Sequence, residues 1–201
     1  MKKLGFDIVL LGMITSGKET QANILKNKYA LKFIETGVFS RKLLKEKGKD
    51  GEKARQTAGK GHPLPTALLQ KFLIKEVNKR PKNKDLLFLG GPRLKPEAQL
   101  LKKMLHQKKQ DFLAFYIDLP DKEVYTRSRK RRVGNMKKIY KILDEEKIIK
   151  RRINYTKKQV SKTVKYFQSL NKLKIINGDQ PILKVTKDIL KSIEEYRKNK
   201  N

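Results

Sequence analysis

Residues 8–20 read IVLLGMITSGKET, an apolar run that leads into a glycine-containing loop with one lysine. The four apolar residues at its start are typical of a strand that is covered on both faces. Gly12 and the Gly17-Lys18 pair then have the GxxxxGK spacing of a phosphate-binding loop. In such a loop backbone N–H groups turn toward phosphate oxygens, the next helix adds its positive end, and the lysine supplies a mobile cation. The stretch therefore predicts a strand, a triphosphate-binding loop and a helix, in that order.

Four more apolar runs follow the first strand, and most of the segments between them have helical spacing. The runs cover residues 32–35, 86–90, 112–119 and 173–177. This alternation predicts an α/β fold with a five-stranded parallel sheet and helices on both faces. Residues 143–170 have the spacing of one long helix or two abutting helices, and we expect a last helix at about 181–196.

Length and composition limit the classes of protein that the chain can belong to. It has 201 residues, enough for one domain, and no cysteine, which excludes disulfides and thiol chemistry. Two histidines, His62 and His106, leave little for a histidine-based metal site. No apolar stretch is long enough to span a membrane, so we expect a cytoplasmic protein with no membrane partner.

The formal net charge is +31, and lysine supplies 40 of the 51 basic residues. Such a charge attracts polyanions, including nucleotides and nucleic acids. The favoured interpretation of this net charge is a lysine-rich composition with solvated basic faces. Nucleic-acid binding stays a second interpretation, without a recognition motif to support it.

From the phosphate-binding loop onward the chain resembles the adenylate kinase family, which transfers a phosphoryl group from ATP to AMP. Lys18-x-Thr20-Gln21 is similar to that family's GKGTQ, and the resemblance runs in order over about residues 5–195. The other matched segments are Thr36-Gly37 with Arg41, Gly61 to Pro65, Gly90-Gly91-Pro92-Arg93, the arginines Arg127, Arg131 and Arg152, and Ile176-Asn177-Gly178.

The resemblance implies one P-loop kinase domain with two smaller parts that can move. Its core would be residues 1–36, 65–132 and 142–196. A small helical segment at about 37–64 would bind the nucleoside monophosphate, and a short lid without zinc ligands would cover about 133–141. By composition alone, the segments at about 48–65 and 131–141 are equally compatible with ordinary surface connections.

The resemblance also implies three sets of site residues and one cofactor, and no dedicated metal ligands. ATP would contact Gly12, Ser16, Gly17, Lys18, Glu19, Thr20, Arg127, Arg131 and Gln180. The monophosphate would contact Thr36, Gly37, Arg41, Leu64, Gly90, Arg93 and Glu97. The catalytic set would be Lys18, Arg93, Arg127, Arg131 and Arg152. Magnesium would arrive with ATP, and the Thr20 hydroxyl is the nearest candidate to meet it.

The placement of arginine supports this assignment from within the sequence. The chain has only 11 arginines, and five of them fall at the matched positions 41, 93, 127, 131 and 152. A lysine-rich chain that places arginine there indicates planar, bidentate contacts with phosphate, which lysine cannot make.

Four departures from the family pattern stand out, and one of them is that Lys141 and Leu143 stand near positions where the family has an arginine and an aspartate in its lid. Leu89 stands where the family has an aspartate that organises magnesium-bound water, which puts magnesium handling in doubt. Glu19 replaces a glycine of the loop and would oppose the triphosphate if it pointed inward. Glu97 stands where the family reads adenine with glutamine, and its carboxylate would suit the two adjacent donors of guanine.

These departures leave three hypotheses open. The favoured one is a monomeric nucleoside monophosphate kinase that uses ATP, with AMP the leading acceptor and GMP or another nucleotide possible. The second is a nucleotide-binding protein of the same fold with impaired catalysis. The third is a basic module that binds nucleic acid.

Overall fold

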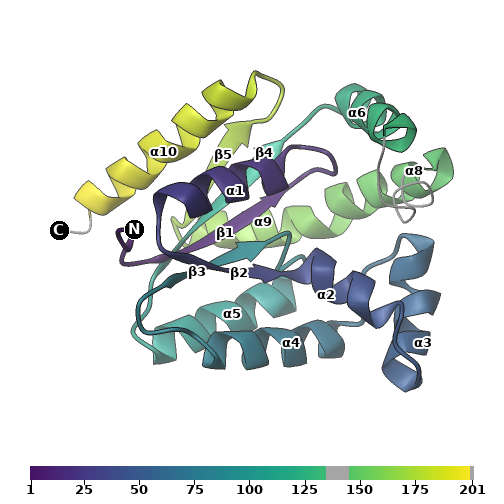
Figure 1. The fold of residues 1–201 in the computed structure, drawn as a ribbon, viewed down its shortest axis with the longest axis horizontal. Helices are drawn as coiled ribbons and strands as arrows, with labels where there is room; N and C mark the ends of the chain where they lie inside the picture. Colours follow the sequence, from purple (N-terminus) through teal and green to yellow (C-terminus); the bar gives the residue numbers. More distant parts are fainter. Residues whose placement is uncertain (135–144, 200–201) are drawn as a thin grey trace.

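The computed structural model describes residues 1–134 and 145–199, which form an α/β fold (Figure 1). Within these residues five strands make one parallel sheet in the order β2-β3-β1-β4-β5. The strands are β1 (Asp7–Gly12), β2 (Leu31–Glu35), β3 (Asp85–Leu89), β4 (Phe112–Asp118) and β5 (Leu173–Asn177). The predicted α/β fold with a five-stranded parallel sheet is confirmed, and each predicted strand end lies within one residue of the observed end.

Helices cover both faces of the sheet (Figure 1). One face packs against α1 (Lys18–Lys28) and α10 (Ile182–Lys198), and the other against α4 (Thr66–Asn78), α5 (Lys95–Gln107) and α9 (Ser161–Ser169). Side chains of a strand alternate between faces, so Ile8 and Leu10 join the first core and Val9 and Leu11 the second. This explains why the first strand is apolar at successive positions.

The remaining helices lie around the carboxyl ends of the strands. They are α2 (Thr36–Leu43), α3 (Lys49–Gln56), a short 3-10 turn (Ala58–Lys60), α6 (Asp121–Val133) and α8 (Glu146–Tyr155). A π-helical turn, Thr156–Val160, joins α8 to α9, so the long helical stretch expected from the sequence is one run with a local widening. The predicted lid at about 133–141 falls mostly on residues 135–144, which lie outside the described residues. Across the described helices, none combines the length and the hydropathy that a bilayer-spanning segment requires.

A buried ion pair fastens the amino end of the sheet. Asp7, the first residue of β1, is fully buried and pairs with Arg80, whose Nη1 lies 2.8 Å from Asp7 Oδ1. The same carboxylate accepts the N–H of Leu86 at 2.8 Å, which ties β1 to the start of β3. Burial raises the pKa of Asp7, while the Arg80 guanidinium acts against that rise. The carboxylate therefore depends on Arg80 to stay charged out of water.

Replacing Arg80 with methionine should lower the free energy of unfolding by about 3 kcal/mol, because it leaves an uncompensated charge in the interior. Lys82→Met, an exposed change in the same connection, is the control and should shift it by less than about 0.5 kcal/mol. Urea unfolding of the three proteins measures both values. Equal stability of the Arg80 and Lys82 variants would show that the pair is not needed.

Candidate nucleotide-binding site

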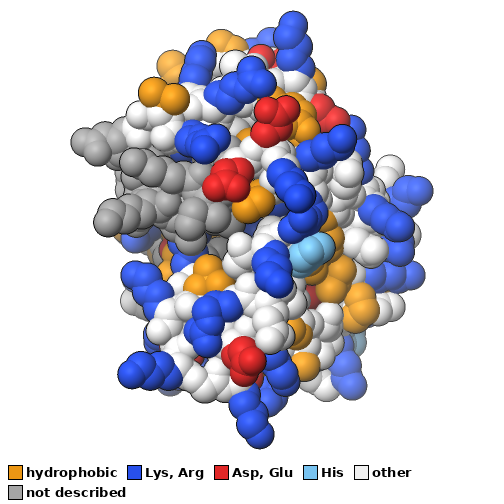
Figure 2. All heavy atoms as spheres, turned by 90° about the vertical axis from the view of Figure 1, so that its right-hand side faces the viewer, with side chains coloured by type: hydrophobic (Ala, Val, Ile, Leu, Met, Phe, Trp, Pro, Cys, Tyr) orange, Lys and Arg blue, Asp and Glu red, His pale blue; other side chains and the backbone are white. Residues whose placement is uncertain are grey.

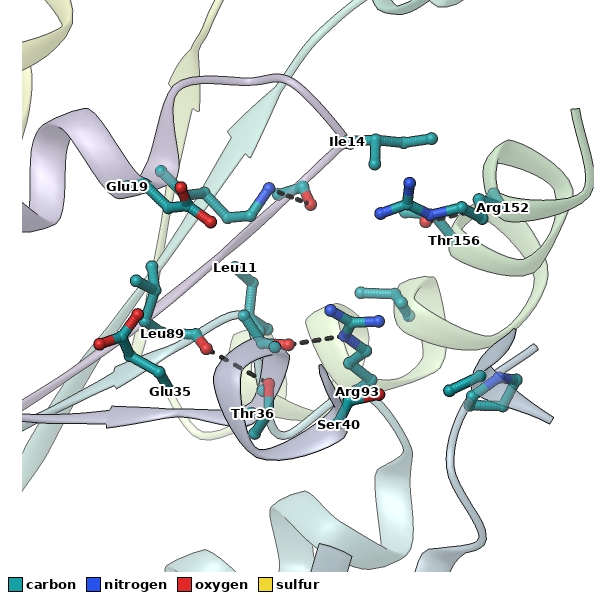
Figure 3. A pocket seen from close by; sticks show the side chains of 18 of the residues that line it. Leu11, Ile14, Glu19, Glu35, Thr36, Ser40, Leu89, Arg93, Arg152 and Thr156 are labelled. Atoms are coloured by element: carbon teal, nitrogen blue, oxygen red, sulfur yellow. Dashed lines mark hydrogen bonds between the residues drawn. The ribbon is translucent and has the colours of Figure 1, made fainter. Parts of the chain in front are cut away.

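A cavity of about 430 Å³ opens at the carboxyl ends of β1, β2 and β3 (Figure 3). It is lined by the phosphate-binding loop, the start of α2, the turn after β3, and residues of α6 and α8. Basic side chains are far more numerous than acidic ones on the end of the molecule where α3 and α8 lie (Figure 2). Carboxyl ends of parallel strands are where open α/β sheets bind ligands, so this cavity is the candidate site.

The phosphate-binding loop has the tight backbone that its sequence predicts. Gly12 has φ +149°, and a Cβ there would lie 2.3 Å from the carbonyl oxygen of Ile117 on β4. Gly17 has φ +83° and directly precedes α1, which begins at Lys18. The first N–H groups of a helix have no intrahelical partner, and the first residues of α1 line the cavity. The loop is therefore shaped to receive anionic oxygens.

Lys18 lies inside this loop. Its ammonium donates hydrogen bonds to the carbonyl oxygens of Gly12, at 3.0 Å, and Met13, and to Ser16 Oγ at 3.2 Å. Burial, and after it the nearby charges of Arg93 and Arg152, lower the pKa of Lys18 to about 7. Glu19 is exposed at the edge of the cavity, and its charge acts in the opposite direction. A bound triphosphate would supply the anion that a protonated Lys18 needs.

ATP binding should therefore take up protons in a pH-dependent way. With a pKa near 7, Lys18 is mostly neutral at pH 8 before ATP binds and charged afterwards. We expect uptake of about one proton per ATP near pH 8, and about a tenth of a proton from this group near pH 6. Calorimetry in buffers of different ionisation enthalpy measures the uptake. No uptake near pH 8 would contradict a neutral Lys18 in the free protein.

All five arginines singled out from the sequence line the same cavity: Arg41, Arg93, Arg127, Arg131 and Arg152. Arg93, from the turn after β3, and Arg152, from α8, both point into it (Figure 3). Arg93 Nε donates to the Gly90 carbonyl at 2.6 Å, and Thr163 on α9 donates to the Arg93 carbonyl at 2.9 Å. Arg127 is held between Glu123 and Asp179, at 3.4 and 3.5 Å. The fold thus gathers these guanidinium groups, from distant parts of the chain, around one volume.

The far end of the cavity contains the residues expected to meet the monophosphate. Thr36 Oγ1 donates to the Leu89 carbonyl at 3.3 Å, which joins α2 to the end of β3, and Gly37 and Leu64 line the wall nearby. Gly91 is needed beside Thr36, because a Cβ there would lie 2.6 Å from Thr36 Cγ2.

Glu97 is buried, and one of its carboxylate oxygens caps the helix to which it belongs. Its Oε2 accepts the N–H groups of Arg93, at 2.9 Å, and Leu94, at 3.2 Å, which caps α5. Its Oε1 is buried without a hydrogen-bond partner among the described residues, and so is the hydroxyl of Tyr155. Burial raises the pKa of Glu97, and burial raises that of Tyr155 to about 12. A ligand N–H that bonded to Glu97 Oε1 would displace no partner among the described residues, but it would first have to reach a buried atom.

One residue expected at the site lies outside the cavity lining, and several residues that line the cavity were not foreseen, Glu35 and Tyr155 among them. Gln180, at the start of α10, donates to Asp188 at 2.7 Å and is not among the residues that line the cavity. Glu35 ends β2 and lines the cavity. It pairs in register with Leu89, the position of the missing aspartate. Glu35 could have been identified only from the register of β2 on β3, which places it beside Leu89.

A parallel sheet with a phosphate-binding loop after its first strand, and a cationic cavity at the strand ends, defines a P-loop protein of the nucleotide-kinase type. The family model for adenylate kinase matches residues 10–172. The chain belongs to the adenylate kinase family.

Curated relatives agree with the family model over most of the chain. It is 30% identical over 189 residues to an adenylate kinase of Bacteroides fragilis, covering 94% of this chain and 98% of the relative. It is 33% identical over 181 residues to an adenylate kinase of Flavobacterium psychrophilum, covering 90% and 94%. An adenylate kinase of Methanothrix thermoacetophila is 26% identical over 214 aligned positions, covering 95% and 100%.

Proposed function

We propose that the protein transfers the terminal phosphoryl group of ATP to a nucleoside monophosphate, with AMP as the favoured acceptor. The observation that carries this proposal is the gathering of Lys18 and five arginines on the wall of one cavity. An acceptor phosphate oxygen would form the new bond to the terminal phosphorus as the bond to the leaving ADP oxygen breaks. No proton needs to be removed by a base, so catalysis rests on position and charge.

Lys18 and the five arginines would contact different parts of the two nucleotides or the phosphoryl group in transfer. Lys18 and the loop backbone would hold the donor phosphates, while Arg41 and Arg93 would hold the acceptor phosphate. Arg127, Arg131 and Arg152 would neutralise charge on the phosphoryl group as it passes between them. A cytoplasmic location and a monomeric state stay predictions from the sequence.

Magnesium is the cofactor that the family resemblance implies. Leu89 is apolar and buried and cannot take part, but Glu35 beside it and Thr20 carry hard oxygen donors and line the same cavity. No group of three or more acidic or histidine side chains is gathered within residues 1–134 and 145–199, which fits a cation that keeps most of its water. When bound, magnesium would offset charge on the ATP phosphates. We assign Glu35 to hold its water.

Glu35→Gln should raise the magnesium concentration needed for half-saturation of the ATP complex about fivefold to tenfold. ATP affinity in the presence of a chelator should stay unchanged, because the carboxylate acts through the cation. Glu195→Gln, at an exposed position of α10 outside the cavity lining, is the control and should change neither value by more than about twofold. Magnesium titration of ATP binding by calorimetry separates the outcomes, and equal behaviour of the two variants would remove Glu35 from this role.

GMP is a second candidate acceptor because of one observation, the unpartnered Oε1 of Glu97 in the cavity wall. A carboxylate oxygen accepts N–H groups, which guanine offers side by side on its pairing edge. A coupled assay of ADP formation with ATP, magnesium and each nucleoside monophosphate tests the function and ranks the acceptors. Turnover at background for every acceptor would contradict the proposed function.

A further inference from the structure

The outer surface of α4, α5 and α9 is exposed to solvent and carries basic side chains without exposed acidic ones. Of the two acidic residues on these helices, Glu97 is buried and Glu76 is half-buried and paired with Lys32 at 3.2 Å. We call the exposed cations the lysine face: Lys71, Lys75, Lys95, Lys102, Lys103, Lys162 and Lys165.

The opposite side of the sheet differs, although it belongs to the same lysine-rich chain. On α1 and α10 the exposed acids Glu19, Glu194 and Glu195 are interspersed with exposed lysines. Those lysines are Lys26, Lys28, Lys184, Lys187, Lys191 and Lys198. The two layers lie on opposite sides of the sheet (Figure 1). Both layers carry more exposed lysines than exposed acids, but only the lysine face carries them without any exposed acid among its described residues.

Neighbouring lysines of the lysine face lie close together. Lys71 and Lys75 are four residues apart on α4, so their stems are about 6 Å apart along the helix axis. Like charges at this spacing repel and disfavour an isolated helix. Because α5 packs between α4 and α9, the cations of three helices share one surface. A polyanion laid across it would relieve the repulsion at several points together.

A groove of about 460 Å³ opens on this surface between α4 and α5. Ile74, Leu100 and Met104 give it an apolar floor, and Asn78, Lys103 and Gln107 contribute polar groups. An apolar floor with amides and a cation around it suits an unpaired base or a sugar next to a phosphate. The groove shares no lining residue with the nucleotide cavity.

The composition of the surface distinguishes among anionic partners. A face that inserts into a membrane needs several exposed apolar side chains, and Ile74 is the one large exposed hydrophobic residue among the described residues of these helices. The three helices contain no arginine, so base-specific bidentate contacts are not available. Lysine ammonium groups bind phosphates as point charges, whatever the sequence of the strand.

We propose that the lysine face and its groove bind single-stranded nucleic acid through the phosphate backbone, independently of sequence. Because the surface lies away from the nucleotide cavity, this binding is separate from the kinase reaction.

The test uses the full chain and a fluorescent single-stranded RNA of about 20 nucleotides of mixed sequence, with binding followed by anisotropy over a series of potassium chloride concentrations. We expect affinity that falls steeply with salt, and similar affinity for DNA of the same length. A variant with Lys71, Lys75, Lys103 and Lys162 each changed to glutamine should bind RNA about tenfold more weakly near 0.1 M salt, with a salt slope smaller by about 2 to 3.

The matched control changes Lys28, Lys184, Lys187 and Lys191 to glutamine, which removes the same net charge from the opposite layer. It should lose less than about threefold in RNA affinity. ATP binding and thermal unfolding show whether both variants are folded. Equal loss in the two variants would assign binding to total charge and overturn the proposal, as would binding to anionic phospholipid vesicles without binding to RNA.

Discussion

Replacing Lys18 with methionine should lower kcat for ADP formation about a thousandfold. Methionine keeps most of the length of the side chain but removes the ammonium, which the structure holds within the loop by bonds to Gly12, Met13 and Ser16. A preorganised cation facing developing charge is worth about 3 to 4 kcal/mol in such sites. Steady-state kinetics at saturating ATP and AMP measure the change.

Lys28→Met is the control for Lys18→Met, since Lys28 is an exposed cation on the last turn of the same helix. It should keep kcat within about twofold of the unchanged protein. If Lys18→Met retained a tenth or more of the activity, the loop would not be the donor site. Circular dichroism and thermal unfolding establish that both variants are folded.

Arg93→Lys should lower kcat/KM for AMP about a hundredfold, although the net charge is unchanged. Arg93 is held at the cavity wall by its own Nε bond to Gly90 and by the bond from Thr163 to its carbonyl. Lysine cannot offer the planar pair of N–H groups that binds a phosphate at two oxygens. The KM for AMP should rise more than the KM for ATP, because Arg93 is assigned to the acceptor.

Arg129→Lys provides the comparison for Arg93→Lys. Arg129 is an exposed arginine of α6 that is not among the cavity-lining residues. Its replacement should leave both KM values within about twofold. An Arg93 variant that behaved like the Arg129 variant, or that affected ATP alone, would contradict the acceptor assignment.

The strands and the loop could be predicted because their signals are local. Residues 8–11 are apolar at successive positions, since the strand is buried on both faces, and the glycine spacing of the next segment is dictated by backbone geometry. The arginines of the site could be predicted for a different reason. Their positions match the family, and the choice of arginine in a lysine-rich chain is a second, independent indication of phosphate binding.

Features that depend on contacts between distant segments could not be predicted. Glu35 matters because β2 pairs with β3 and places it beside Leu89, and no local pattern encodes that register. The Asp7–Arg80 pair likewise joins residues more than 70 positions apart. Gln180 was expected near ATP, but its side-chain amide donates to Asp188 of α10. This contact depends on the path of the chain just before α10, which the sequence does not indicate.

The departures at Glu19 and Glu97 have different structural consequences. Glu19 is exposed at the edge of the cavity, so most of its charge is screened by solvent. Glu97 caps α5 with one oxygen and leaves the other unpartnered within the described part of the chain. The Glu97 carboxylate is therefore compatible with the fold, and we expect it to influence which acceptor base is bound.

The most direct test of the account is the fate of the terminal phosphate of ATP when AMP and magnesium are present. With ATP labelled at the terminal phosphorus, the label should appear in the outer phosphate of newly formed ADP, with two ADP produced for each AMP consumed and little free phosphate. Release of the label as inorganic phosphate, or nucleotide binding without transfer, would show that the cavity does not hold donor and acceptor face to face.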